Sequence, residues 1–135
     1  GWRGRSMSLG IADAVTVLAK SAADADVAAT LIANEVNVDF PGIEKRPASE
    51  VKDESDLGMI PVTVHVPDLP EDKISTALER GANTARKFIK AGKITAAYLS
   101  LQKQTLVIDN NLAAVVNSCH SRESGNPETC KYLKK

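Results

Sequence analysis

Residues 12–34, ADAVTVLAKSAADADVAATLIAN, decide the fold of this chain. Residues 14–19 form a short apolar run with β-branched side chains, which is typical of a largely buried strand. Ser21 follows at the point where a helix begins, and Asp24 three residues later completes a variant of the capping pattern. Alanine dominates this helix. Because alanine is a strong helix former and small, the helix can approach a sheet or a ligand closely.

Two polar side chains of this helix, Asp26 and Thr30, are the first candidate site. Residues four apart share one helix face, with Cβ atoms roughly 6 Å apart, so a carboxylate and a hydroxyl can contact one small ligand. Oxygen ligands suit Mg²⁺, and a nearby helix N-terminus favours a phosphate. The spacing predicts a site for a metal-bound phosphate. The alternative is that Asp26 is a solvated acid of the first turns and that Thr30 lies at the edge of the core.

The remaining elements are predicted from periodicity and from breaking residues. Residues 41–59 are charged and contain proline and glycine, which indicates a long loop. Residues 60–66 alternate and predict a strand, and an apolar stripe predicts a helix of about 20 residues that begins at Pro70. Two further strands, 94–101 and 105–109, form a hairpin. The order β-α-β-α-β-β predicts an α+β fold with both helices on one face of a sheet.

The composition divides the chain into one domain and a tail. Residues 1–111 are enough for one modest core. Residues 112–135 are mostly polar, which predicts a disordered or foreign tail. Cys119, His120 and Cys130 lie in this tail. They offer three soft ligands without the fourth that closes a zinc site, so no zinc site is predicted.

The charge balance argues against two classes of partner. Seventeen basic and seventeen acidic residues cancel, so neither nucleic acid nor an anionic membrane is an expected partner. No segment has the roughly 18 uninterrupted apolar residues that a spanning helix needs, and residues 1–5 lead into no signal-like apolar run. We therefore expect a cytoplasmic protein.

The strings ADAVTVLA at residues 12–19 and AADADVAAT at residues 22–30 resemble the ApbE-like superfamily, the FAD:protein FMN transferases, and most of all its uncharacterised cytoplasmic branch. The likeness covers about residues 1–109 and continues through RPAS at 46–49, DLG at 56–58 and the segment 94–108. It implies that the chain is the C-terminal half of an ApbE-like architecture, with a T-fold-like sheet. The superfamily's N-terminal half, with its Gly-Gly-Asp segment, has no counterpart here.

The resemblance also implies a ligand site. The transferase residues that match Asp26 and Thr30 help to ligate the divalent metal at the flavin diphosphate, so Mg²⁺ and FAD or FMN are the expected cofactors. The loop before the first strand can cradle an anion, a mobile terminus being the alternative. Its candidate cofactor-binding residues are Arg5, Ser6, Ser8 and Gly10. Arg5 stands where the branch usually has histidine, which keeps a donor but removes a group that exchanges protons near neutral pH.

Two function hypotheses follow. The first is a remnant of a flavin-diphosphate and Mg²⁺-binding ApbE-like protein. It is not catalytically competent alone, because a centre built from two halves loses orienting contacts when one is absent. The second is a non-catalytic structural module without a ligand that self-associates, since a half-sheet leaves an open edge and an apolar face. We expect a homo-oligomer, paired through the sheet edge or through the open face near the loop of residues 4–10.

Overall fold

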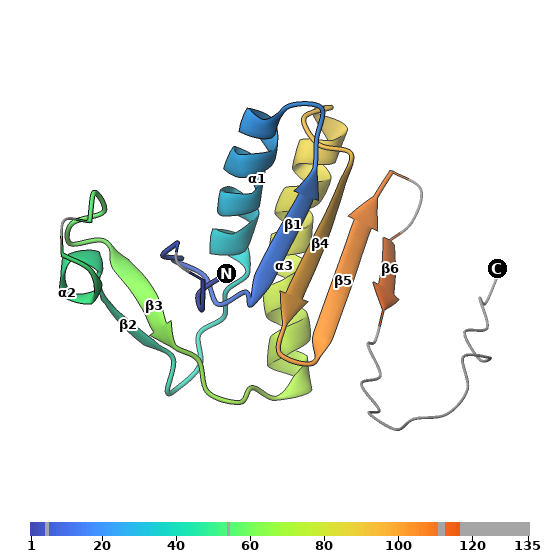
Figure 1. Ribbon diagram of the computed structural model, residues 1–135. Coiled ribbons are helices and arrows are strands. Elements are labelled where there is room, and N and C mark those ends of the chain that lie inside the picture. The colour runs from blue at the N-terminus through green and yellow to red at the C-terminus, as the bar shows by residue number, and fades with distance from the viewer. Residues whose placement is uncertain (5, 54, 111–112, 117–135) are drawn as a thin grey trace, which may run out of the picture.

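The computed structural model describes residues 1–4, 6–53, 55–110 and 113–116, and it confirms the α+β class. A four-stranded antiparallel sheet has the order β1-β4-β5-β6. Its strands are β1 (Ala14–Leu18), β4 (Ala96–Leu101), β5 (Gln104–Asp109) and β6 (Ala113–Val116). Two helices, α1 (Ala22–Glu35) and α3 (Glu71–Lys90), pack side by side behind this sheet and leave its other face uncovered (Figure 1).

The start of α1 confirms the capping prediction. The Ser21 hydroxyl accepts a hydrogen bond from the Asp24 backbone N–H at 3.1 Å and donates one to the Asp24 carboxylate at 2.8 Å. The hydroxyl thereby satisfies one of the N–H groups that every helix start leaves without an intrahelical partner. The alanine-rich helix then buries Ala28 and Ile32 against the sheet and against α3.

The second long helix, α3, begins after Pro70 and also follows its prediction. Its apolar stripe is buried in the core and consists of Ile74, Ala77, Leu78, Gly81, Ala82 and Ala85. Gly81 marks the closest approach: a Cβ atom there would lie 2.4 Å from Val36 Cγ2 and 2.8 Å from Leu99 Cδ2. The absent side chain lets α3 pack directly on α1 and β4.

A two-residue turn, Gln102-Lys103, joins β4 to β5 in the predicted hairpin. In register, Leu99 lies opposite Leu106 and Ala97 lies opposite Ile108, and these four side chains are part of the core together with Leu101. Gln102 adopts a positive φ of 51°, which is uncommon for a residue other than glycine. The hairpin prediction is therefore confirmed, but the strained turn residue carried no sequence signal.

The single sheet expected from the sequence is wrong. Strand β3 (Pro61–His65) pairs with β2 (Glu44–Pro47) in a separate two-stranded sheet, and a short helix α2 (Ala48–Val51) follows β2. Both β2 and α2 lie inside residues 41–59, where a loop was expected. The β2 sequence, EKRP, is charged and lacks apolar alternation, so its strand conformation comes from pairing with β3.

Strand β6 extends the main sheet past the expected end of the domain. Ala113–Val116 pairs antiparallel with β5, although these residues belong to the segment 112–135 that the sequence assigned to a tail. The three candidate soft ligands Cys119, His120 and Cys130 lie outside the described residues. Among the helices that the structure describes, none is long and apolar enough to cross a membrane.

Candidate functional site

The N-terminal loop and α1 enclose a small hollow of about 110 Å³. Three residues predicted from the sequence meet there: Ser6 and Ser8 on the loop and Thr30 on the helix. The other lining residues are Gly1, Met7, Val15, Ala29, Ala33 and Asn34. The structure thus brings together two candidate sites that are more than twenty residues apart in the sequence. From the sequence, the loop was predicted to bind the cofactor and Thr30 to bind the metal, but no contact between the loop and α1 was predicted.

Ser8 and Gly10 fasten the loop to α1. Ser8 is only 4% exposed, and its hydroxyl donates to Asn34 Oδ1 at 3.4 Å and accepts from the Gly10 N–H at 3.2 Å. A Cβ on Gly10 would lie 2.0 Å from the Ala33 carbonyl oxygen, so only glycine fits against the helix. Both residues therefore make contacts within the fold that account for their identity without a ligand.

Asp26 and Thr30 share the exposed side of α1, as the four-residue spacing predicts. Thr30 lines the small hollow, whereas Asp26, one turn earlier, does not. Within residues 1–4, 6–53, 55–110 and 113–116, no group of three His, Cys, Asp or Glu side chains is placed to hold a metal ion. The remaining candidate, Arg5, lies outside the described residues.

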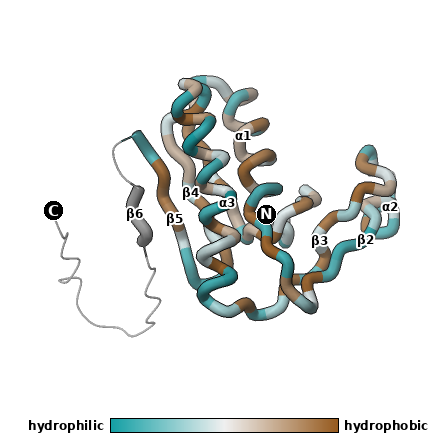
Figure 2. Tube along the Cα trace, turned by 180° about the vertical axis from the view of Figure 1, so that it is seen from behind, coloured by the Kyte–Doolittle hydropathy of each residue, from teal (hydrophilic) through white to brown (hydrophobic). Residues whose placement is uncertain are grey.

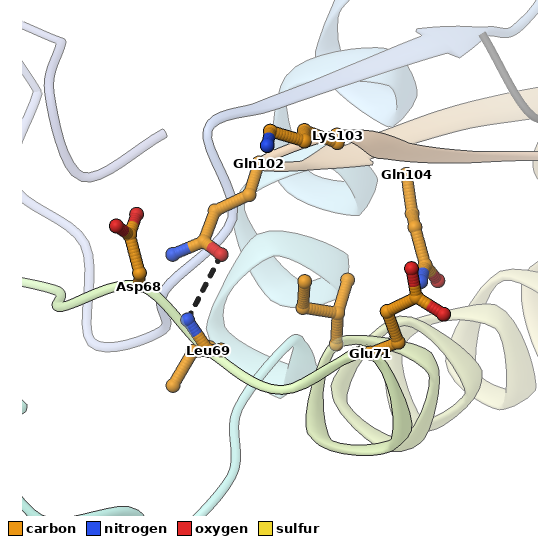
Figure 3. Close-up of a pocket in the computed structure, with 7 residues that line it drawn as sticks. Asp68, Leu69, Glu71, Gln102, Lys103 and Gln104 are labelled. Carbon is orange, nitrogen blue, oxygen red and sulfur yellow. Dashed lines mark hydrogen bonds between the residues drawn. The ribbon is translucent and has the colours of Figure 1, made fainter. Parts of the chain in front are cut away.

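A second, polar hollow of about 380 Å³ lies where the β4–β5 turn meets the start of α3 (Figure 3). The Gln102 side chain forms part of the wall of this hollow. Its Oε1 accepts a hydrogen bond from the Leu69 N–H at 3.1 Å, and its Nε2 donates one to the Pro67 carbonyl at 2.7 Å. Asp68 and Glu71 place carboxylates around it (Figure 3). Both ends of the amide make a hydrogen bond that joins the hairpin to the segment before α3, which gives this side chain a structural role. The sequence analysis missed this contact.

An apolar groove of about 640 Å³ crosses the outer side of the two long helices. Leu31 on α1, Phe88 on α3 and Leu9 on the loop supply its apolar lining. Leu31 and Val27, one turn apart on α1, are 45% and 55% exposed. Hydrophobic turns of α1 are visible from this side in Figure 2. Lys87 and Lys93 bring positive charge to the groove.

The face of the main sheet opposite the two long helices is a further candidate surface, and an open apolar face was expected from the sequence. By pairing register, β1, β4 and β5 each place three side chains on the face opposite the helices: Ala14, Thr16, Leu18, Ala96, Tyr98, Ser100, Thr105, Val107 and Asp109. Thr105 is nevertheless buried, with 7% of its surface exposed. One of these nine, Asp109, is charged. Leu18 is 62% exposed and Tyr98 39% exposed. Five of the nine side chains are apolar or aromatic, a larger share than a fully solvated antiparallel face normally carries, so this face resembles one that is covered.

Residues 1–109 match the family described as AbpE bacteria. The chain belongs to this family. The match ends at the last residue of β5, so it includes both long helices, the hairpin and the small β2–β3 sheet. No curated protein and no solved structure matches the chain.

This match corrects the resemblance drawn from the sequence. The family found is AbpE bacteria and not a flavin-transferase family, so the expected membership of the ApbE-like superfamily is wrong. The interpretation of residues 1–109 as the second half of a flavin protein depended on that membership and is no longer supported. The two sequence segments on which the resemblance was based, residues 12–19 and 22–30, have local structural roles. Ser21 and Asp24 form the cap of α1, and the alanines allow this helix to pack closely. Any protein with such a strand and helix can carry them.

Proposed function

We propose that this AbpE bacteria family chain is a non-catalytic module that self-associates through the open face of its main sheet. The observation that carries this proposal is the near absence of charge on that face, where one side chain in nine is ionisable at neutral pH. Leu18 and Tyr98 remain substantially exposed there, and burying both on two symmetric copies removes four large apolar groups from water.

The open face is a better candidate for the dimer interface than the free edge of β1. The edge strand, AVTVL, has no charge or proline to discourage pairing. However, the N-terminal residues cover the start of this edge strand. The Trp2 N–H donates a hydrogen bond to the Ala12 carbonyl at 3.0 Å, and Gly1 lies directly against the Asp13 backbone. A partner strand would collide with Gly1 at this end, whereas no described helix, strand or loop of the backbone crosses the open face in Figure 1.

The size of the face sets the expected affinity. Strands lie about 4.8 Å apart and rise about 3.3 Å per residue, so β1, β4 and β5 present a patch of roughly 14 by 18 Å. Such a patch is smaller than the roughly 800 Å² per partner of a standard stable interface. We therefore expect a reversible dimer that forms at micromolar concentration.

Sedimentation equilibrium of the full chain tests the proposal. Wild type should fit a monomer–dimer equilibrium, and Leu18→Lys should shift it to monomer because the interface would bury two lysines. Val27→Lys is the matched control, since Val27 is similarly exposed but lies on α1, on the opposite side. A wild type that stays monomeric at several hundred micromolar, or equal dimerisation of both variants and wild type, would refute the proposal.

A second candidate function is binding of Mg²⁺ together with a flavin nucleotide at α1. Its support is the convergence of Ser6 and Thr30 on one hollow, with Asp26 one turn away on the same helix. Titration calorimetry with Mn²⁺ or Mg²⁺, with and without FAD, tests it. Asp26→Ala should abolish metal binding and leave the fold unchanged, because Asp26 is exposed. Identical isotherms for wild type and variant, or binding of FAD without metal, would exclude this function.

A further inference from the structure

The groove on the helical side of the molecule has the features of a small-ligand site. Its volume of about 640 Å³ falls within the range of pockets that hold small molecules. Leu31, Phe88 and Leu9 form an apolar lining from three separate segments of the chain. Leu31 is nearly half exposed despite this position, so a ligand here would cover an apolar side chain that water now contacts.

The charge around the groove is positive. Lys87 and Lys93 line it together with a single acid, Glu35. Within the part of the chain that the structure describes, neither lysine forms a salt bridge. A lysine can lay its apolar stem along the groove and present its ammonium group at the rim. The site therefore combines an apolar body with a cationic end.

Backbone geometry fixes one of these lysines. At the end of α3, Gly92 has a φ of +69°, and the Lys93 N–H donates back to the Phe88 carbonyl at 3.0 Å. The Gly92 N–H donates to the Ile89 carbonyl at 2.9 Å, which completes a Schellman motif. This closing turn fixes the backbone of Lys93 beside that of Phe88, so the two residues that line the groove come from one rigid helix end.

We propose that this groove binds a small amphipathic anion, an apolar chain or ring that carries one carboxylate. The apolar part lies on Leu31 and Phe88, and the carboxylate pairs with Lys87 and Lys93. Charge complementarity selects an anion, because two lysines against one acid leave one net positive charge, which matches a single negative group. A helical protein partner would need a longer exposed stripe, because on α1 the large exposed apolar residues are Val27 and Leu31 alone. The site lies on the helical side, away from the proposed dimer face.

Octanoate and octylamine are suitable probes, because they share one apolar chain and differ in the sign of the head group. In ¹⁵N NMR titrations of the labelled full chain, octanoate should cause saturable chemical-shift changes at the amides of Leu31, Phe88 and Lys93, which line the groove. Octylamine should bind at least about ten-fold more weakly, because its ammonium group would lie beside the two lysine ammonium groups with only Glu35 to offset them. Shifts of equal size for both probes, or shifts scattered over the surface, would overturn the proposal.

Variants separate the two parts of the site. The double variant Lys87→Gln with Lys93→Gln should weaken octanoate at least about five-fold and remove its dependence on salt, and Leu31→Gln should weaken both probes. The matched controls are Lys103→Gln and Val51→Gln, an exposed lysine and an exposed apolar residue elsewhere. Equal effects of variants and controls would contradict the site. Leu18→Lys should bind octanoate like wild type, so failure here and failure of self-association are distinguishable.

Discussion

Gln102 is the residue whose replacement should most clearly test the packing of this fold. Its side-chain amide bridges the Leu69 N–H and the Pro67 carbonyl, while its own backbone N–H donates to the Asp13 carboxylate. One residue therefore joins the β4–β5 turn to the start of β1 and to the segment that leads into α3. It does so at a φ of 51°, a conformation that disfavours any side chain.

Replacing Gln102 separates these two contributions. Gln102→Ala removes both amide hydrogen bonds and keeps the strained backbone, so we expect a loss of about 2 kcal/mol in the free energy of unfolding, about 1 kcal/mol per bond. Gln102→Gly removes the same bonds but relieves a backbone strain of about 1 kcal/mol. The glycine variant should therefore be about 1 kcal/mol more stable than the alanine variant. The bond to Asp13 uses the backbone and persists in both.

Urea denaturation followed by the emission of Trp2, the single tryptophan, measures these differences. All variants need one protein concentration, because any dimer adds apparent stability. Lys103→Ala, the neighbouring turn residue, is the control and should change stability by less than about 0.5 kcal/mol. If Gln102→Ala matches wild type, the amide does not hold the hairpin. If Gln102→Gly is no more stable than Gln102→Ala, the positive φ carries no cost.

Three further substitutions have defined outcomes in the same assay. Gly81→Ala should destabilise by about 1–3 kcal/mol although alanine favours helices, because its Cβ would overlap Val36 and Leu99; a stabilised variant would contradict the close approach. Ser21→Ala should cost about 1 kcal/mol through the lost cap of α1, and no change would mean that the cap is dispensable. Gly92→Ala should cost about 1 kcal/mol from backbone strain alone, because its Cβ meets no atom within 4 Å; a loss above about 3 kcal/mol would show an additional clash.

The elements with strong local signals could be predicted from the sequence. Ser21 caps α1 where expected, α3 spans the expected stripe, and the hairpin lies at the expected turn. These features depend on side chains within a few residues of one another, so the sequence carries their cause. Strand β2 was missed because its conformation depends on pairing with β3, about fifteen residues later in the chain. The side-chain contacts of Gln102 were missed because its partners lie more than thirty residues away.

The candidate site illustrates why loop composition alone cannot separate ligand binding from packing. Small residues and hydroxyls suit an anion because they allow close backbone approach and donate hydrogen bonds. The same properties suit a helix: Ser8 uses its hydroxyl on Asn34 and Gly10, and Gly10 admits the Ala33 carbonyl at a distance that no side chain permits. What distinguishes the two cases is whether the donors are already used within the fold. The Ser8 hydroxyl makes such bonds, whereas within the described part of the chain the Ser6 and Thr30 hydroxyls line the hollow without one. Ser6 and Thr30, and not Ser8 or Gly10, are therefore the residues whose substitution would reveal a ligand.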